Sequence, residues 1–135
     1  MTPFNLKIIT PEKVVFDGET EQIIARTTVG DVGILKGHEP YCAALGIGQM
    51  RVKIDGEFRH GATSGGLIKV NKEGTVVLVQ TFEWSDEIDL DRANAAKETA
   101  ESRLQSSKDD AELRMAEAKL RRALNRIDTA GFSGK

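Results

Sequence analysis

The sequence is poor in several residue types, and each shortage excludes a class of protein. One cysteine among 135 residues permits neither an internal disulfide nor a cysteine-built zinc site. The two histidines, His38 and His60, do not have metal-ligand spacing with Cys42, so we expect no metal site. Basic residues (19) do not exceed acidic ones (21), and the net charge of −2 argues against a protein that binds nucleic acid or a membrane surface.

Long apolar runs are also missing. No stretch approaches the roughly 20 residues that a membrane helix needs. The first residues lack a basic region followed by an apolar run, so no signal peptide is expected. These shortages predict a soluble, intracellular protein.

Catalytic motifs are absent as well. The glycine-rich stretch 30–37 lacks the Gly-Lys-Ser/Thr ending of a phosphate loop, and we interpret it as a surface loop with turn glycines. Residues 64–66 (SGG) do not form the Gly-x-Ser-x-Gly of a nucleophile elbow and predict a turn. Because no nucleophile can be paired with a base, we expect no catalytic residues and a protein that is not an enzyme.

What is present divides the chain into two unlike parts. Residues 86–135 hold 21 of the charged residues, two glycines and no proline, whereas residues 1–85 hold the other 11 glycines and all three prolines. This shift predicts two domains, 1–85 and 86–135. The fold class is α+β with segregated parts: an N-terminal antiparallel β-sandwich, or flattened barrel, followed by a C-terminal antiparallel hairpin of two helices.

The first part contains many short β patterns separated by turn residues. Asp55-Gly56 lies between two such patterns and is a strong hairpin signal, and residues 71–74 (NKEG) predict a second hairpin. Residues 76–79 (VVLV) are apolar at every position and predict a central strand. We also expect separate strands at 57–62 and 67–70, joined by the turn at 64–66.

The second part predicts two helices that pack lightly. Residues 88–105 are rich in strong helix formers, and Ser107 with Asp110 resembles a capping box that starts the second helix. Gly131 is expected to end it. The apolar stripes consist largely of alanine, which buries little surface, so this hairpin is a candidate for detachment.

The hairpin gathers charge at its open end. If two antiparallel helices join near residue 107, the start of the first lies beside the end of the second. Asp89 and Arg92 share one face, and Arg122 and Arg126, four residues apart, share another. Clustered guanidiniums are suited to phosphate oxygens. Acidic residues at a helix start and basic residues at a helix end also follow from the helix dipole, so ordinary surface pairing remains the alternative.

Four segments together resemble the epsilon subunit of bacterial F-type ATP synthases. They are residues 7–12 (KIITPE), 30–38 (GDVGILKGH), 64–66 (SGG) and 88–93 (IDLDRA), and the resemblance covers essentially the whole chain. Each segment is weak evidence alone, but the ordered set is specific. Lys36 stands where members of the family commonly carry proline, which predicts a looser loop there.

The resemblance implies a rotor-stalk subunit at the cytoplasmic face of the bacterial cell membrane, attached only through the complex. In the family, a ten-stranded β-sandwich binds the gamma subunit and rests on the c-subunit ring, with Asp31 and His38 matching residues that face these partners. The hairpin is regulatory: folded, it permits rotation, and extended along gamma to the catalytic head of alpha and beta subunits, it blocks ATP hydrolysis.

The resemblance also implies a regulatory ligand, ATP, with or without magnesium, and no catalytic cofactor. In several bacterial members the folded hairpin binds ATP. The residues of this sequence that match the family's ATP contacts are Glu83, Ile88, Asp89, Arg92, Ala93, Arg122 and Arg126. The expected function is therefore that of a stalk subunit of a proton-translocating synthase, in which ATP stabilises the non-inhibitory hairpin.

Two other functions remain open at this stage. One is a free-standing nucleotide-binding regulator without a rotary partner, which would not co-purify with gamma. The other is an inert spacer whose hairpin never moves, so that its deletion would not raise the ATPase activity of the assembled head.

Overall fold

The structure, a computed structural model, describes residues 2–132. Residue 1 and residues 133–135, the last of the predicted helical domain, lie outside it. The chain divides into two compact units, with the division between Glu83 and Trp84. The first unit holds the strands and the second holds the helices.

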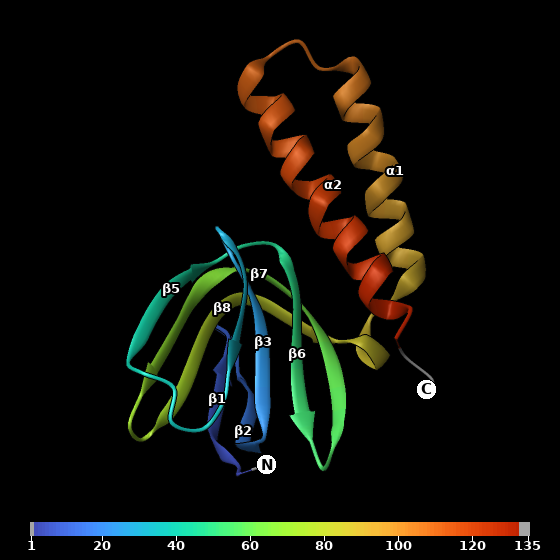
Figure 1. Ribbon diagram of the computed structural model, residues 1–135. Helices are drawn as coiled ribbons and strands as arrows, with labels where there is room; N and C mark the ends of the chain where they lie inside the picture. The colour runs from blue at the N-terminus through green and yellow to red at the C-terminus, as the bar shows by residue number, and fades with distance from the viewer. Residues whose placement is uncertain (1, 133–135) are drawn as a thin grey trace. The chain divides into compact units, whose positions relative to one another are not determined.

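Eight strands make up the first unit (Figure 1). They are β1 (Phe4–Ile9), β2 (Val14–Thr20), β3 (Gln22–Thr27), β4 (Gly30–Ile34), β5 (Tyr41–Leu45), β6 (Gly48–Ile54), β7 (Glu57–Asn71) and β8 (Gly74–Trp84). Within residues 2–132 the strands number eight, not the ten that the resemblance implied. One source of the difference is β7, a single strand of 15 residues where two strands were expected. The predicted β-sandwich is confirmed, with one departure from an antiparallel arrangement: β1 and β8 pair in parallel.

The strand β7 corrects the predicted turn at residues 64–66. Its first half pairs with β6, from Gly48↔Thr63 to Ile54↔Glu57, and its second half pairs with β5. Gly65 and Gly66 have φ values of 51° and 156°, so the strand bends there and changes partner without breaking. The sequence pattern did not distinguish this bend from a turn, because glycine is typical of both.

The glycine-rich stretch also differs from the prediction of a loop. Gly30–Ile34 forms β4, which pairs residue by residue with β3 from Thr27↔Gly30 to Ile23↔Ile34. Only the two residues between Thr27 and Gly30 make the turn, where the Thr27 hydroxyl donates to the Gly30 carbonyl at 2.6 Å. The Tyr41–Leu45 strand, β5, was not predicted.

The core of the first unit consists of large aliphatic side chains. Buried residues alternate along the strands, as in the pattern of β1, because successive side chains point to opposite faces of a sheet. β8 lies between β1 and β7, which confirms the predicted central strand, although Leu78 is 48% exposed. The largest fully buried side chains are Leu6, Ile8, Ile23, Ile34, Met50, Ile68, Val52 and Val77.

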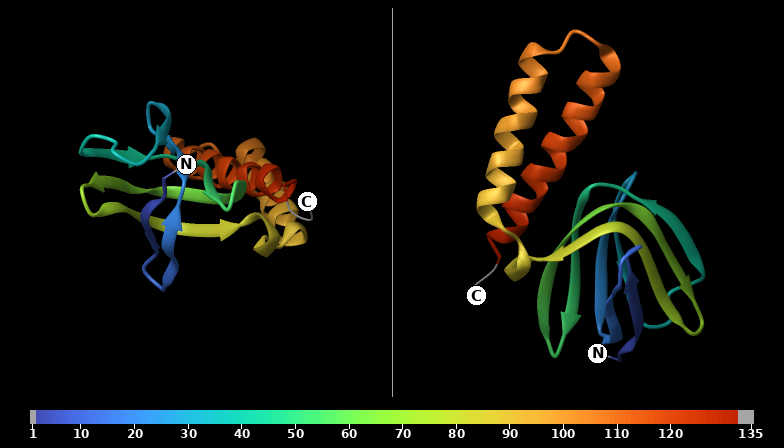
Figure 2. Two further views of the ribbon diagram at one scale, coloured as in Figure 1. Left: turned by 60° about the horizontal axis from the view of Figure 1, so that its bottom comes forward. Right: turned by 180° about the vertical axis from the view of Figure 1, so that it is seen from behind.

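The second unit begins with a 3₁₀ turn, η1 (Ser85–Glu87), and continues as two helices, α1 (Leu90–Ser106) and α2 (Asp110–Ala130). The helices pack together as an antiparallel hairpin (Figures 1 and 2). Two predicted starts are corrected by the caps. Asp89 is the N-cap of α1, so Ile88 precedes the helix, and Asp109, not Ser107, is the N-cap of α2.

The packed faces of the hairpin are built of alanine, as predicted. Ala93 and Ala100 are the buried residues of α1, and Ala116 and Ala123, with Thr129, are those of α2. Each α1 alanine has an α2 counterpart equally distant from position 108, so the four alanines mark the seam. Leucines of the predicted stripe are only half-buried or, like Leu124, exposed.

Candidate functional site

The start of α1 carries four of the predicted nucleotide-binding residues. Ile88 and Asp89 precede the helix, and Arg92 and Ala93 lie in its first turn. The Asp89 carboxylate accepts a hydrogen bond from the backbone N–H of Arg92 at 3.0 Å, which satisfies a helix-start donor and fixes the direction of the chain. Ala93 is buried in the seam, whereas the Arg92 side chain is exposed.

The end of α2 carries two more. Arg122 and Arg126 lie one helical turn apart and are both half-buried. The seam places Ala123 at the level of Ala93, so Arg122 belongs to the same end of the hairpin as Arg92. The end of α2 also contacts η1. The hairpin therefore gathers both pairs of candidate residues at its open end.

In the part of the chain that the structure describes, surface ion pairing, the alternative to a ligand site, is not seen for two of the three arginines. Among residues 2–132, neither the Arg92 nor the Arg122 guanidinium forms an ion pair with a carboxylate. The Asp89 carboxylate is engaged with backbone, not with the Arg92 side chain. Two unpaired guanidiniums at one end of a hairpin provide ten N–H donors of the kind that bind phosphate oxygens.

Glu83, the remaining candidate, belongs to the first unit. It lies in β8 next to the division between the units and is half-buried. Glu83 is close to Ile88 and Asp89 in the sequence, although the division between the two units lies between them.

Asp31 and His38, the predicted partner-contact residues, lie at different places in the first unit. Asp31 follows the β3–β4 turn and pairs with Arg26, whose hydrogen bond holds the pKa of the Asp31 carboxyl below its usual range. His38 follows the other end of β4, where its ring contacts Tyr41 edge-on at 5.6 Å and its Nδ1 lies 2.8 Å from the Glu39 carbonyl oxygen. The two residues thus lie beside opposite ends of β4.

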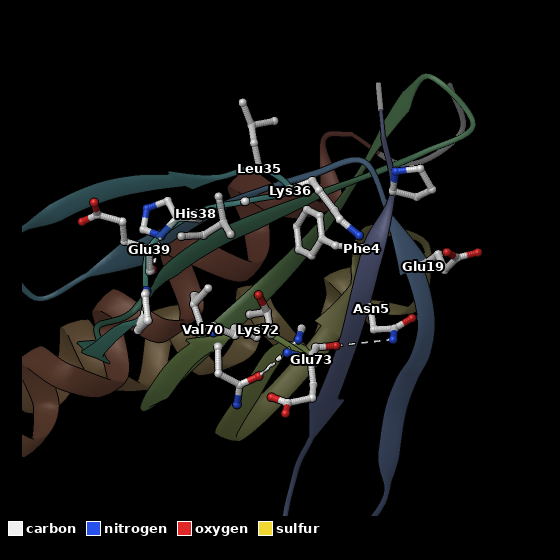
Figure 3. A pocket seen from close by; sticks show the side chains of 17 residues that line it. Phe4, Asn5, Glu19, Leu35, Lys36, His38, Glu39, Val70, Lys72 and Glu73 are labelled. Atoms are coloured by element: carbon white, nitrogen blue, oxygen red, sulfur yellow. Dashed lines mark hydrogen bonds between the residues drawn. The ribbon is translucent and has the colours of Figure 1, made fainter.

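A pocket that the sequence patterns did not reveal lies beside His38 (Figure 3). Its residues come from the start of β1, the loop after β4 and the β7–β8 turn, which are far apart in the sequence. Some of these residues belong to patterns described above, the 30–38 segment and the 71–74 turn, but neither pattern indicates that the two lie side by side. The pairing register of the strands brings the pocket residues together, and no local sequence pattern predicts that register.

Two features of other sites are absent from the residues that the structure describes. No group of three or more His, Cys, Asp or Glu side chains is placed to hold a metal ion. No helix within residues 2–132 has the length and apolar character to cross a membrane.

Comparison with known proteins identifies the class that this architecture defines. A family model for the beta-sandwich domain of the ATP synthase delta/epsilon chain matches residues 3–85, and one for the long alpha-helix domain of the same chain matches residues 86–131. The molecule is therefore of the delta/epsilon type, a sandwich followed by a helical domain.

Similar proteins narrow the assignment. The ATP synthase epsilon chain of Ruminococcus albus is 47% identical over 96% of this chain and 98% of its own length. That of Bacillus velezensis is 43% identical over 97% and 99%. The chain belongs to the ATP synthase epsilon chain family, and it is a non-catalytic subunit of the central stalk of ATP synthase.

Solved structures agree with this assignment. A chain of the Euglena gracilis mitochondrial ATP synthase superposes with a TM-score of 0.79 at 26% identity, covering 90% of this chain and 77% of that one. A chain from the central stalk and c-ring structure of the Tetrahymena thermophila enzyme superposes with a TM-score of 0.65 at 13% identity, which shows the shared fold.

Proposed function

We propose that this protein couples rotation within a proton-translocating F-type ATP synthase, through a sandwich that binds the gamma subunit and the c-subunit ring. Family membership and the resemblance of residues 30–38 to the family's contact segment support this role. Asp31 and His38 lie at separate places, which suits two partners. The protein would act at the cytoplasmic face of the cell membrane, where it is held only by these partners.

The hairpin supplies the regulatory part of the proposal. Folded, it permits rotation, and extended along gamma it blocks ATP hydrolysis at the head of alpha and beta subunits. Arg114, Lys119, Arg121, Arg122 and Arg126 give α2 a basic surface for acidic partners in that head. Because an alanine seam buries little apolar area, the folded hairpin is a state that a ligand or a partner can displace.

ATP is the proposed ligand of the folded hairpin. Arg92, Arg122 and Arg126 would bind the phosphates, and Asp89 and Glu83 would accept hydrogen bonds from the base or ribose or orient the guanidiniums. Ile88 and Ala93 would contact the base. The observation that carries the proposal is that Arg92 and Arg122 form no ion pair with any residue in the described range 2–132. Clustered cations without partners are stabilised when an anion binds among them.

Binding of ATP only to the folded hairpin shifts its equilibrium by linkage. At a free ATP concentration one hundred times the Kd, the folded state gains about 2.7 kcal/mol. That exceeds what is needed to invert a population when the two states differ by one or two kcal/mol. The chain carries no phosphate loop, so ATP acts here as a signal of nucleotide supply and is not consumed.

Calorimetric titration of the full chain with ATP, with ADP and GTP as controls, tests the site. We expect saturable, one-to-one binding that is selective for ATP. Arg122→Ala and Arg126→Ala should each weaken it about tenfold or more, the loss typical of one charge-assisted contact. Arg121→Ala, which removes an exposed arginine of the same helix, is the matched control and should leave the Kd unchanged. Unchanged affinity in both site variants would remove the assignment of the phosphate contacts.

The stalk role has a separate test. Co-purification with gamma distinguishes a rotor subunit from a free-standing regulator. In the assembled synthase, Asp31→Lys should lower the coupling of rotation to proton flow. Coupling and gamma binding that are both unaffected would contradict the partner surfaces, whatever the result of the ATP titration.

A further inference from the structure

The pocket beside His38 has features of a second ligand site, on the sandwich instead of the hairpin. Its volume is about 470 Å³, within the range of about 300–1,000 Å³ typical of small-molecule pockets. All of its lining residues lie between positions 3 and 75, so it belongs wholly to the first unit. It therefore shares no residue with the proposed nucleotide site.

One wall of the pocket, the β7–β8 turn, is fixed by side-chain hydrogen bonds. The Asn71 side-chain oxygen accepts from the backbone N–H groups of Glu73 at 3.0 Å and Gly74 at 3.2 Å. Asn5 of β1 donates to the Glu73 carbonyl oxygen at 3.4 Å. Gly74 has a φ of 143°, and a Cβ there would lie 2.6 Å from the Asn5 carbonyl oxygen, so the turn lies directly against β1.

The opposite wall is the loop after β4, and it too has defined contacts. The His38 backbone N–H donates to the Leu35 carbonyl at 3.1 Å, which closes a turn around Lys36. The contacts of the His38 ring with Tyr41 and Glu39 described above hold its far end. Both walls are thus shaped before any ligand arrives, which lowers the entropic cost of binding.

The interior combines apolar surface with one hydroxyl that has no partner. Phe4, Ile34 and Val70 are buried residues of the lining. Thr75, also in the lining, is 2% exposed, and its Oγ1 makes no hydrogen bond with any of the residues that the structure describes. A buried polar group without a partner is costly in free energy, so a ligand atom that pairs with this hydroxyl gains affinity from removing that cost.

Cationic side chains stand at the two walls. Lys36 is on the loop and Lys72 on the turn, and within residues 2–132 neither forms an ion pair. Three acidic residues are in the lining, Glu19, Glu39 and Glu73, and their side chains extend away from the space between the walls (Figure 3). The two ammonium groups are therefore the charges available to a ligand between the walls.

We propose that this pocket binds a small amphipathic anion: one carboxylate or phosphate group on a short apolar body that also carries a hydrogen-bonding oxygen. The anionic group lies between the ammonium groups of Lys36 and Lys72. The apolar body contacts Phe4, Ile34 and Val70, and the oxygen pairs with the Thr75 hydroxyl. The sandwich thereby has a ligand-binding site of its own, separate from the proposed ATP site.

Two-dimensional amide NMR on the full chain tests this with 4-hydroxybenzoate, which has all three features. Benzoate lacks the distal oxygen, and phenol lacks the anionic group. We expect saturable shifts confined to residues 3–5, 34–40 and 70–75, with 4-hydroxybenzoate binding at least threefold more tightly than either of the other two. Octanoate, free or presented in anionic phospholipid vesicles, distinguishes a free metabolite from a lipid as the source of the anion.

Three variants sharpen the result. Lys36→Ala combined with Lys72→Ala should weaken the binding of 4-hydroxybenzoate about tenfold, whereas Lys13→Ala with Lys108→Ala removes the same charge outside the pocket and should not change it. Thr75→Val keeps the shape and should abolish the preference for 4-hydroxybenzoate over benzoate. Shifts that are absent, that scatter over the surface, or that weaken equally in both lysine pairs would overturn the proposal. ATP added to the same sample reports the hairpin residues separately, so the two sites succeed or fail independently.

Discussion

The sandwich and the helical hairpin are stabilised by different side chains. The sandwich buries large aliphatic residues such as Ile23 and Ile68 completely, while the seam of the hairpin is made of four alanines. Burial of one such aliphatic side chain contributes about 1.5–3 kcal/mol, against about 0.8 kcal/mol for a methyl group. The sandwich is therefore the more strongly stabilised part, and the hairpin is the part whose conformation a ligand or partner can change more easily.

The largest effect we expect is that of Gly66→Ala in the sandwich. A Cβ at this position would lie 2.0 Å from the Leu78 carbonyl oxygen, and the φ of 156° is one that other residues rarely adopt. Backbone has to move in two strands, so we expect a loss of about 3–5 kcal/mol in the free energy of unfolding. Gly37→Ala, with a positive φ but no atom within 4 Å, is the control and should cost about 1 kcal/mol. Equal losses, measured by urea denaturation, would contradict the steric argument.

Ala123→Leu tests the seam of the hairpin. Ala123 has 0% exposure, so a larger side chain has to separate the helices, at a cost of about 1–3 kcal/mol. The comparison of the two parts predicts that hydrogen-exchange protection falls in α1 and α2 and stays unchanged in the strands. Leu124→Ala, at an exposed neighbouring position, should have little effect. Loss of protection throughout the chain would mean that the two parts unfold together.

Two substitutions of Asp89 distinguish its contribution to hairpin stability from its proposed role in ligand binding. Asp89→Ala removes the N-cap and should cost about 1 kcal/mol of helix stability. Asp89→Ser keeps a capping oxygen and removes the carboxylate, so the helix should melt nearly as in the unmodified chain. Circular dichroism measures the first property and ATP titration the second. If both variants melt alike, capping is not what Asp89 contributes.

The smallest effect concerns His60 in the sandwich. Burial, and then the positive charge of Arg51, lower the pKa of His60 below 6.5. The folded state therefore binds fewer protons than the unfolded chain, and the stability contributed by the neutral ring is present above pH 6.5 and declines as pH falls from 6.5 through the folded-state pKa. His60→Gln should flatten this part of the curve of unfolding free energy against pH. A curve of the same shape in the variant would assign the decline to other groups.

Local sequence patterns predicted both parts of the fold because strands and helices differ in the spacing of their apolar residues. Alternating apolar residues and turn pairs such as Asp55-Gly56 mark strands, and the composition of residues 86–135 marks helices. Local sequence patterns gave wrong predictions where the structure depends on which strands pair with each other. Whether Gly65 and Gly66 form a turn or a bend depends on β5 and β6, which lie elsewhere in the sequence.

The candidate sites differ in the same way. The arginine cluster was predictable because helical spacing and an antiparallel hairpin fix which residues share an end. The pocket beside His38 was not, since Asn5, Lys36 and Thr75 come together only through the pairing of β1 with β8 and the path of the loop after β4. Its unpaired hydroxyl is visible only in three dimensions.

The unbroken course of β7 has a mechanical consequence. Glu57–Asn71 is hydrogen-bonded to β6 along its first half and to β5 along its second, so the two neighbours are joined by one covalent backbone. A twisting load that enters at one neighbour reaches the other through that backbone and through ladders of hydrogen bonds loaded side by side. In a central stalk, which turns under load, such a strand makes the sandwich behave as one stiff body.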